Sequence, residues 1–147
     1  MEFMDLKEIQ SSLPYLPPFL FVDELQHVDE VSAIGTFTFK STLDFYKGHF
    51  KDIPVTPGVI LTETMAQIGV VCLGIYLLRN EPPNRGQFVM TSAAVDFLKP
   101  VLPGEKVTVS SEKVYFRFNK LKCAVKMQNS KQEIVCAGTI SGKIIKS

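Results

Sequence analysis

The chain has 147 residues, of which 46% are hydrophobic and 21% charged, as expected for one folded globular domain. Its net charge of +1 argues against nucleic acid or a bulk membrane surface as the main partner, because such partners favour strongly basic domains. Three cysteines cannot all pair within one chain, and the first ten residues lack the features of a signal peptide, so we expect a cytoplasmic location.

The first part of the chain predicts a short helix followed by two strands. Residues 5–12 have the pattern of an amphipathic helix, and the prolines of LPYLPP then stop helical propagation. One strand is expected in FLFVDELQHV and another in VSAIGTFTFK, where successive residues alternate between two faces. The two strands would pair around Asp29 and Glu30.

A long apolar helix is expected from Val59 to Leu78, where Glu63 is the only charged residue. We expect this helix to be buried on all sides and to begin with Thr56 as the N-cap and Pro57 at its first position. Cys72 would be a buried packing residue. The longest uncharged run is 15 residues, and a membrane span needs about 20, so we predict no transmembrane segment.

The rest of the chain predicts strands. EPPNRG should end the helix, and four extended stretches follow at residues 87–98, 106–118, 121–128 and 133–144, the last two joined by a turn at NSKQ. Two strands, one helix and four strands indicate an α+β fold, a single domain over residues 1–147 in which an antiparallel sheet wraps one long central helix. Because one helix covers only one face and both sheet edges are open, the fold favours pairing with a second copy.

The stretch GHFKDIPVTPGVILTETMAQ, residues 48–67, carries the candidate chemistry. It combines a histidine in a loop, a Pro/Gly turn and one carboxylate in an apolar helix. An imidazole titrates near neutrality, and burial raises the pKa of a carboxyl group, so His49 and Glu63 suit proton transfer. The absence of a side chain at Gly58 would let a ligand carbonyl approach the free N–H groups of the first helical turn.

This stretch resembles the signature of the FabZ type of (3R)-hydroxyacyl-acyl-carrier-protein dehydratases. The matching positions are GHF at 48–50, PV at 54–55, PGV at 57–59, Glu63, and AQ at 66–67. Weaker resemblance in LPYLPPFLFVDEL and VDFLKPVLPGEKV extends it over most of the chain. The resemblance implies a hot-dog fold and the reversible dehydration of a 3-hydroxyacyl thioester to a trans-2-enoyl thioester, in fatty acid, related lipid or polyene biosynthesis.

The resemblance also implies roles for the site residues. His49 would take the C2 proton, and Glu63 would protonate the departing C3 hydroxyl. The amides of Gly58 and Val59 would hold charge on the thioester oxygen, the Val55 carbonyl would fix the His49 ring, and Gln67 would be a further substrate-binding candidate. No metal or cofactor is expected, and we expect His27 to be an exposed strand residue rather than a ligand.

The partners implied by the resemblance are an acyl carrier protein and a second copy of the chain. A homodimer would build two sites, each taking His49 from one subunit and Glu63 from the other, and hexamers made of three dimers are also common in that family. An acidic carrier would dock on a local basic rim, for which the candidates are Lys51, Arg79, Arg85 and Lys99. Acyl carrier protein and coenzyme A remain alternative carriers.

Several residues depart from the family pattern. Tyr15 and Leu16 stand where the family usually has His-Arg, and Lys51 stands where proline is usual. Thr56, Thr62 and Thr64 replace apolar residues or alanine, which predicts a more polar site. The alternative functions are a hot-dog acyl thioesterase and a non-catalytic acyl-thioester-binding protein; the presence of both His49 and Glu63 favours the dehydratase.

Overall fold

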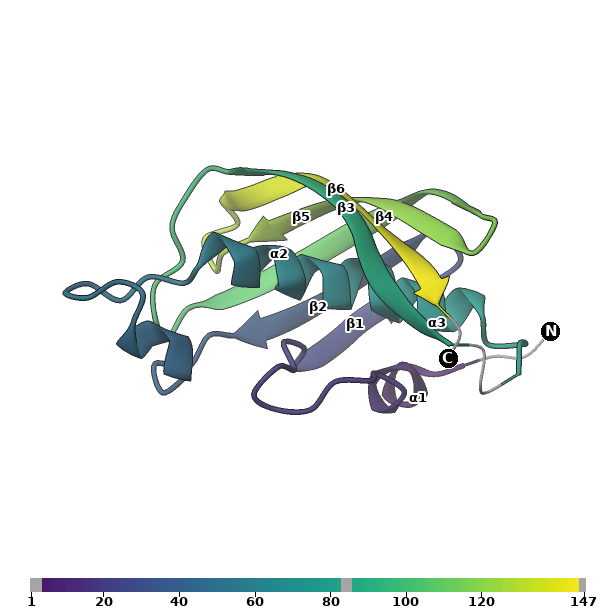
Figure 1. The fold of residues 1–147 in the computed structure, drawn as a ribbon, viewed down its shortest axis with the longest axis horizontal. Helices are drawn as coiled ribbons and strands as arrows, with labels where there is room; N and C mark the ends of the chain where they lie inside the picture. Colours follow the sequence, from purple (N-terminus) through teal and green to yellow (C-terminus); the bar gives the residue numbers. More distant parts are fainter. Residues whose placement is uncertain (1–3, 83–85, 146–147) are drawn as a thin grey trace.

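The protein is described by a computed structural model covering residues 4–82 and 86–145. A six-stranded antiparallel sheet, in the order β1-β2-β4-β5-β6-β3, wraps around one long helix (Figure 1). The predicted α+β arrangement is therefore confirmed. The sheet and the helix enclose one apolar core, in which three free cysteines, Cys72, Cys123 and Cys136, are buried as packing residues.

The N-terminal elements are α1 (Leu6–Ser11), β1 (Glu24–Val28) and β2 (Ser32–Thr38). A reciprocal capping box of Asp5 and Glu8 begins α1, as is usual where an acidic side chain can accept from the free amides of a first turn. The strand β1 starts later than predicted, because the Phe21 N–H donates to a side chain of the central helix instead of to a neighbouring strand. The predicted pairing of β1 with β2 is confirmed, and the Asp29 carboxylate accepts from two amides in the turn.

The central helix is continuous over 20 residues and consists of α2 (Gly58–Met65), the π-helical stretch η2 (Ala66–Val71) and α3 (Cys72–Leu77). A short 3-10 helix, η1 (Asp44–Lys47), and a loop precede it. By length and composition alone the helix could cross a membrane, but most of it is buried inside the fold. It is the core helix that the sheet wraps (Figure 1).

The beginning of the central helix differs from the prediction. Pro57 occupies the N-cap position, Gly58 is the first helical residue, and no side chain caps the helix. Thr56 is not the cap because its hydroxyl is hydrogen-bonded to the hydroxyl of Tyr46. The prediction that the helix is buried on all sides is also wrong for its first turns, since Val59 is 75% exposed and Glu63 is only half-buried. One side of the N-terminal half of the helix is therefore open.

The last four strands are β3 (Gln87–Phe97), β4 (Lys106–Arg117), β5 (Lys120–Gln128) and β6 (Ile134–Ile145), close to the predicted ranges. The NSKQ turn is present, with the Gln132 N–H donating to the Asn129 carbonyl. The turn expected at EPPNRG lies partly outside the described residues. β3 is an edge strand with a mostly exposed surface, so it offers unpaired backbone groups to a partner.

Candidate active site

His49 lies in the loop between η1 and α2, and its ring is held in a defined orientation. Its Nδ1 lies 2.9 Å from the carbonyl oxygen of Val55, the contact predicted from the sequence, and the ring stacks on Phe50. A carbonyl oxygen can only accept, so Nδ1 must carry the proton and donate it. In the neutral ring the lone pair is then on Nε2, the nitrogen that can act as a base.

A buried pair of hydroxyl groups anchors the loop that carries His49. Tyr46 is hydrogen-bonded to Thr56, whose N–H donates to the Val101 carbonyl at 2.9 Å. The hydroxyl of Thr64 donates to the Ile60 carbonyl within the helix. Because both threonine hydroxyls are engaged in this way, the prediction that they make the site more polar is wrong for Thr56 and Thr64.

Gln67 connects Glu63 to the N-terminal loop. Its side chain is fully buried, and its Nε2 donates to Glu63 Oε2 at 3.0 Å and to the Phe19 carbonyl at 3.1 Å. Its Oε1 accepts from the Phe21 N–H at 2.8 Å. The amide is thus engaged within the protein, and it acts on the site by orienting the Glu63 carboxyl group.

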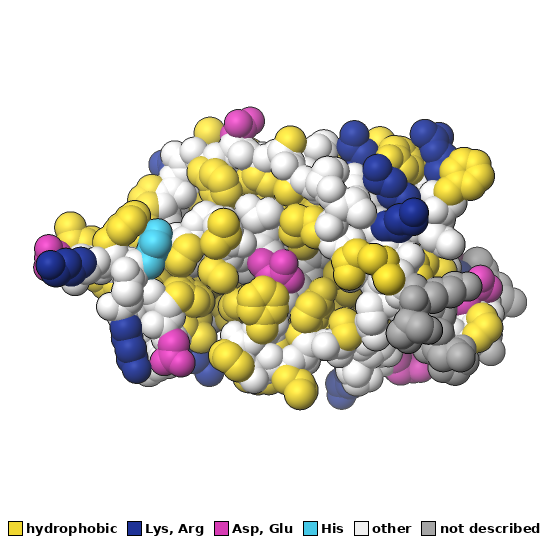
Figure 2. Space-filling model, in the orientation of Figure 1, with side chains coloured by type: hydrophobic (Ala, Val, Ile, Leu, Met, Phe, Trp, Pro, Cys, Tyr) yellow, Lys and Arg dark blue, Asp and Glu magenta, His cyan; other side chains and the backbone are white. Residues whose placement is uncertain are grey.

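Glu63 opens onto a pocket of about 230 Å³ beside the central helix. Figure 2 shows an acidic group surrounded by hydrophobic side chains in the middle of this face. Loss of water around Glu63 raises the pKa of its carboxyl group, and the hydrogen bond from Gln67 partly opposes the shift. The shift is in the direction that a general acid needs, because it extends the pH range over which the carboxyl group keeps its proton. The apolar lining comes from the helix and the strands β3 and β6, chiefly Val70, Val71, Phe88, Met90 and Ile140.

The first turn of α2 provides the backbone donors predicted for the site. The amides of Gly58 and Val59 have no acceptor within the helix, since a first turn lacks the preceding carbonyls. A Cβ at Gly58 would lie 3.2 Å from the ring of Phe97. The glycine thus allows the end of β3 to pack on the helix start. Phe97 itself remains 50% exposed beside the helix start.

The single chain does not bring His49 and Glu63 together. No hydrogen bond links the two side chains within the described residues, and His49 is not among the residues that line the pocket of Glu63. His27, the other histidine, is an exposed strand residue paired with Asp29, as predicted. The described residues include no cluster of three or more His, Cys, Asp or Glu side chains that could hold a metal ion.

The predicted carrier-docking residues have different surroundings. The prediction that Arg79 is a docking residue is wrong, because its side chain is only 5% exposed. The guanidinium group is paired with Glu30 at 2.8 Å and stacks over the ring of Tyr76. Lys99 is paired with Glu133, and Lys51 is exposed. Arg85 lies outside the described residues.

A different basic surface lies on the outer face of the sheet at the turn between β4 and β5. In the strand register Arg117 is opposite Lys120, Lys120 is opposite Lys143, and Tyr115 is opposite Lys122. Figure 2 shows basic side chains gathered beside hydrophobic rings at the upper right, where Figure 1 places this turn. Phe118 at its tip is 90% exposed. We call Arg117, Lys120, Lys122 and Lys143 the hairpin cations.

The hairpin cations were missed in the sequence although a signal is present. Basic residues at every second position of a strand share one face, and KLK in β5 has this spacing. None of the four forms an ion pair with another described residue. Their charge is therefore available to an acidic partner.

Comparison with known proteins finds dehydratases. The sequence model of the ApeI-like family, described as ApeI dehydratase, matches residues 25–139. The 3-hydroxyacyl-[acyl-carrier-protein] dehydratase FabZ of Acinetobacter baylyi is 31% identical over 96% of this chain and 88% of its own length. The FabZ of Clostridium perfringens is 32% identical over 93% of this chain and 96% of its own length.

Solved structures share the fold at low sequence identity. The dehydratase heterocomplex ApeI:P from Xenorhabdus doucetiae aligns with a TM-score of 0.78 and 12% identity, covering 95% of this chain and 91% of that chain. A thioesterase from Haemophilus influenzae aligns with a TM-score of 0.70 and 13% identity, covering 99% and 93%. The predicted hot-dog fold is confirmed.

Proposed function

The chain belongs to the ApeI-like dehydratase family and is a lyase that removes water from 3-hydroxyacyl thioesters, and we propose that His49 and Glu63 carry out this reaction. The observation that carries the proposal is the orientation of the His49 ring, whose Nδ1 donates to the Val55 carbonyl, so that the neutral ring has its lone pair on Nε2. This is the atom that a base needs. The half-buried Glu63, with its raised pKa, supplies the matching acid.

In this mechanism, Nε2 of His49 takes a proton from C2 of the acyl group. The electrons of the C2–H bond form the C2=C3 double bond as the C3–O bond breaks. Glu63 gives its proton to the departing oxygen, which leaves as water, and the proton on His49 returns to Glu63 through solvent. The amides of Gly58 and Val59 stabilise negative charge on the thioester oxygen while it develops.

We propose that the complete site forms between two copies of the chain. β3 is long and mostly exposed, and Val89 and Met90 on it are each more than 40% exposed. Antiparallel pairing of two β3 strands would join the two sheets about a two-fold axis and cover this edge. The loop of one subunit would then bring His49 to the pocket of its partner, which the single chain leaves without a base.

The experiment that tests the function is an assay of the purified protein with a 3-hydroxyacyl thioester attached either to acyl carrier protein or to coenzyme A. We expect formation of the trans-2-enoyl thioester from both, with a higher kcat/KM for the carrier-linked substrate. Release of free thiol without an enoyl product would show a thioesterase. Binding of the acyl thioester without turnover would show a non-catalytic binding protein.

We propose that an acidic acyl carrier protein docks on the hairpin cations, since these four side chains are concentrated on one face and form no ion pair with a described residue. Reversing two of them, in Arg117→Glu combined with Lys120→Glu, should lower kcat/KM for the carrier-linked substrate about tenfold. Activity on a small thioester should not change, because the substitution lies on the outer face of the sheet.

Lys40→Glu is the matched control for this docking test, since Lys40 is an exposed lysine in the loop after β2. It should leave both activities unchanged. A loss confined to Lys51→Glu and Lys99→Glu would place docking on the rim predicted from the sequence. Equal losses on both substrates in the hairpin variant would indicate damage to the fold.

A further inference from the structure

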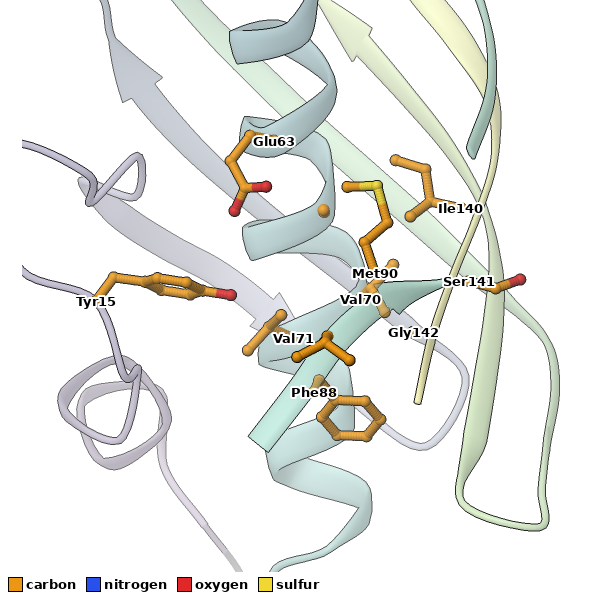
Figure 3. A pocket seen from close by; sticks show the side chains of 11 residues that line it. Tyr15, Glu63, Val70, Val71, Phe88, Met90, Ile140, Ser141 and Gly142 are labelled. Carbon is orange, nitrogen blue, oxygen red and sulfur yellow. The ribbon is translucent and has the colours of Figure 1, made fainter. Parts of the chain in front are cut away.

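The pocket of Glu63 contains a second polar side chain with no role in the mechanism above. Tyr15 reaches it from the N-terminal loop, and the pocket includes both residues in its lining. Figure 3 shows the Tyr15 ring extending toward the central helix, with its hydroxyl between the Glu63 carboxyl group and Val71 in this view. Its hydroxyl forms no hydrogen bond with another described residue, and it is open to solvent, because no fully buried polar side-chain atom of the described residues lacks a partner.

Tyr15 is held firmly in place although it lies in a loop. The loop is tied to the central helix by Gln67, which donates to the Phe19 carbonyl and accepts from the Phe21 N–H. The same amide donates to Glu63. One buried side chain therefore fixes the loop that carries the phenol and the carboxyl group that faces it. The Tyr15 ring also contacts the Phe19 ring.

The remaining lining offers little to a polar ligand. It consists mainly of aliphatic and aromatic side chains, and Ser141, the other residue with a polar side chain, points its hydroxyl away from the pocket in Figure 3. A water molecule in a protein needs two to four polar partners. In this pocket, Tyr15 and Glu63 are the two side chains that can supply them.

We propose that the Tyr15 hydroxyl and the Glu63 carboxyl group together hold the water molecule that leaves C3 during dehydration and that adds to C3 in the reverse reaction. The inference rests on the proposed function and extends it with a further catalytic residue. Glu63 transfers the proton, and Tyr15 donates a hydrogen bond to the oxygen as its bond to C3 lengthens. The phenol suits this role because burial and the neighbouring Glu63 raise its pKa, which keeps its proton in place.

The variant Tyr15→Phe removes the hydroxyl and keeps the ring, so it isolates this contact. We expect kcat to fall about tenfold in dehydration and in hydration of the enoyl thioester, which corresponds to the loss of one hydrogen bond in the transition state. KM should change less than about twofold, because the ring that lines the pocket is retained. Tyr76→Phe makes the same chemical change on α3 outside the pocket and should leave kcat unchanged.

A second measurement separates the role of Tyr15 from the step performed by His49. An acyl thioester without a 3-hydroxyl group has no water to lose, so exchange of its C2 hydrogen in deuterium oxide reports proton removal alone. Tyr15→Phe should leave this exchange unchanged, whereas His49→Ala should abolish it. Unchanged kcat in Tyr15→Phe, a rise in KM without a fall in kcat, or equal falls in exchange and dehydration would overturn the inference. If His49→Ala kept both the exchange of the C2 hydrogen and the dehydration, the proposed function itself would be contradicted.

Discussion

Replacing Glu63 by glutamine should lower kcat for dehydration by between a hundredfold and ten-thousandfold, the usual contribution of a positioned general acid or base. Glutamine has nearly the same shape and can still be hydrogen-bonded to Gln67, but it has no proton to give to the C3 oxygen. His49→Ala should cause a loss of similar size, because it removes the base held by the Val55 carbonyl. The measurement is kcat with a 3-hydroxyacyl thioester at saturating concentration.

Matched controls are available for both substitutions. His27→Ala and Glu24→Gln change an exposed histidine and an exposed glutamate on β1, and both should keep full activity. Thermal unfolding of each variant checks that the fold is retained. Activity losses in Glu63→Gln below tenfold would contradict the assignment of Glu63 as the proton donor.

The same assignment fixes the direction of the pH dependence. Glu63 acts in its protonated form, and its pKa is raised from the ordinary value of 4.5 by burial. The protonated fraction, and with it this contribution to kcat, is therefore lost as the pH rises through the raised pKa. A carbon-detected NMR titration gives the pKa of Glu63 directly, and an ordinary value would contradict the role.

Mixing two inactive variants should restore activity if each site is shared between subunits. A dimer of one His49→Ala chain and one Glu63→Gln chain contains one site that lacks both groups and one site with both intact. Random pairing at equal amounts makes about half of the dimers mixed, each with one working site of two. Recovery should therefore approach about a quarter of wild-type activity per chain if the sites act independently.

The mixing experiment requires subunit exchange, which native mass spectrometry measures on the same samples. Mixed dimers without recovered activity would reject the shared site and favour a dyad contained in one chain.

The strands and the central helix were predictable because their signals are local. The alternation in residues 106–118 and 121–128, with breakers between the stretches, predicted each end of β4 and β5 to within one residue. The contact between His49 and Val55 was also predictable, since the two residues are only six positions apart and belong to one motif.

The errors arose where partners distant in sequence decide the structure. Threonine is a common N-cap residue, but the hydroxyl of Thr56 is hydrogen-bonded to the hydroxyl of Tyr46 instead of to the amides of the helix. Arg79 has the charge of a docking residue, but Glu30, 49 positions away, pairs with it and buries it. Tyr15 was noticed as a departure from the family pattern, yet its place beside Glu63 depends on how Gln67 ties the loop to the helix. Such contacts require the packed structure.

The position of the central helix in the chain has a consequence for synthesis. The most apolar segment of the protein, Gly58–Leu77, leaves the ribosome before β3, β4, β5 and β6, the four strands that complete its cover. At about 5–20 residues per second, those strands follow several seconds later. During that interval the 20-residue apolar helix has α1, β1 and β2 to pack against, but none of the last four strands. Until β6 is complete, part of this apolar helix therefore lacks its cover, and such uncovered apolar surface favours aggregation of the incomplete chain.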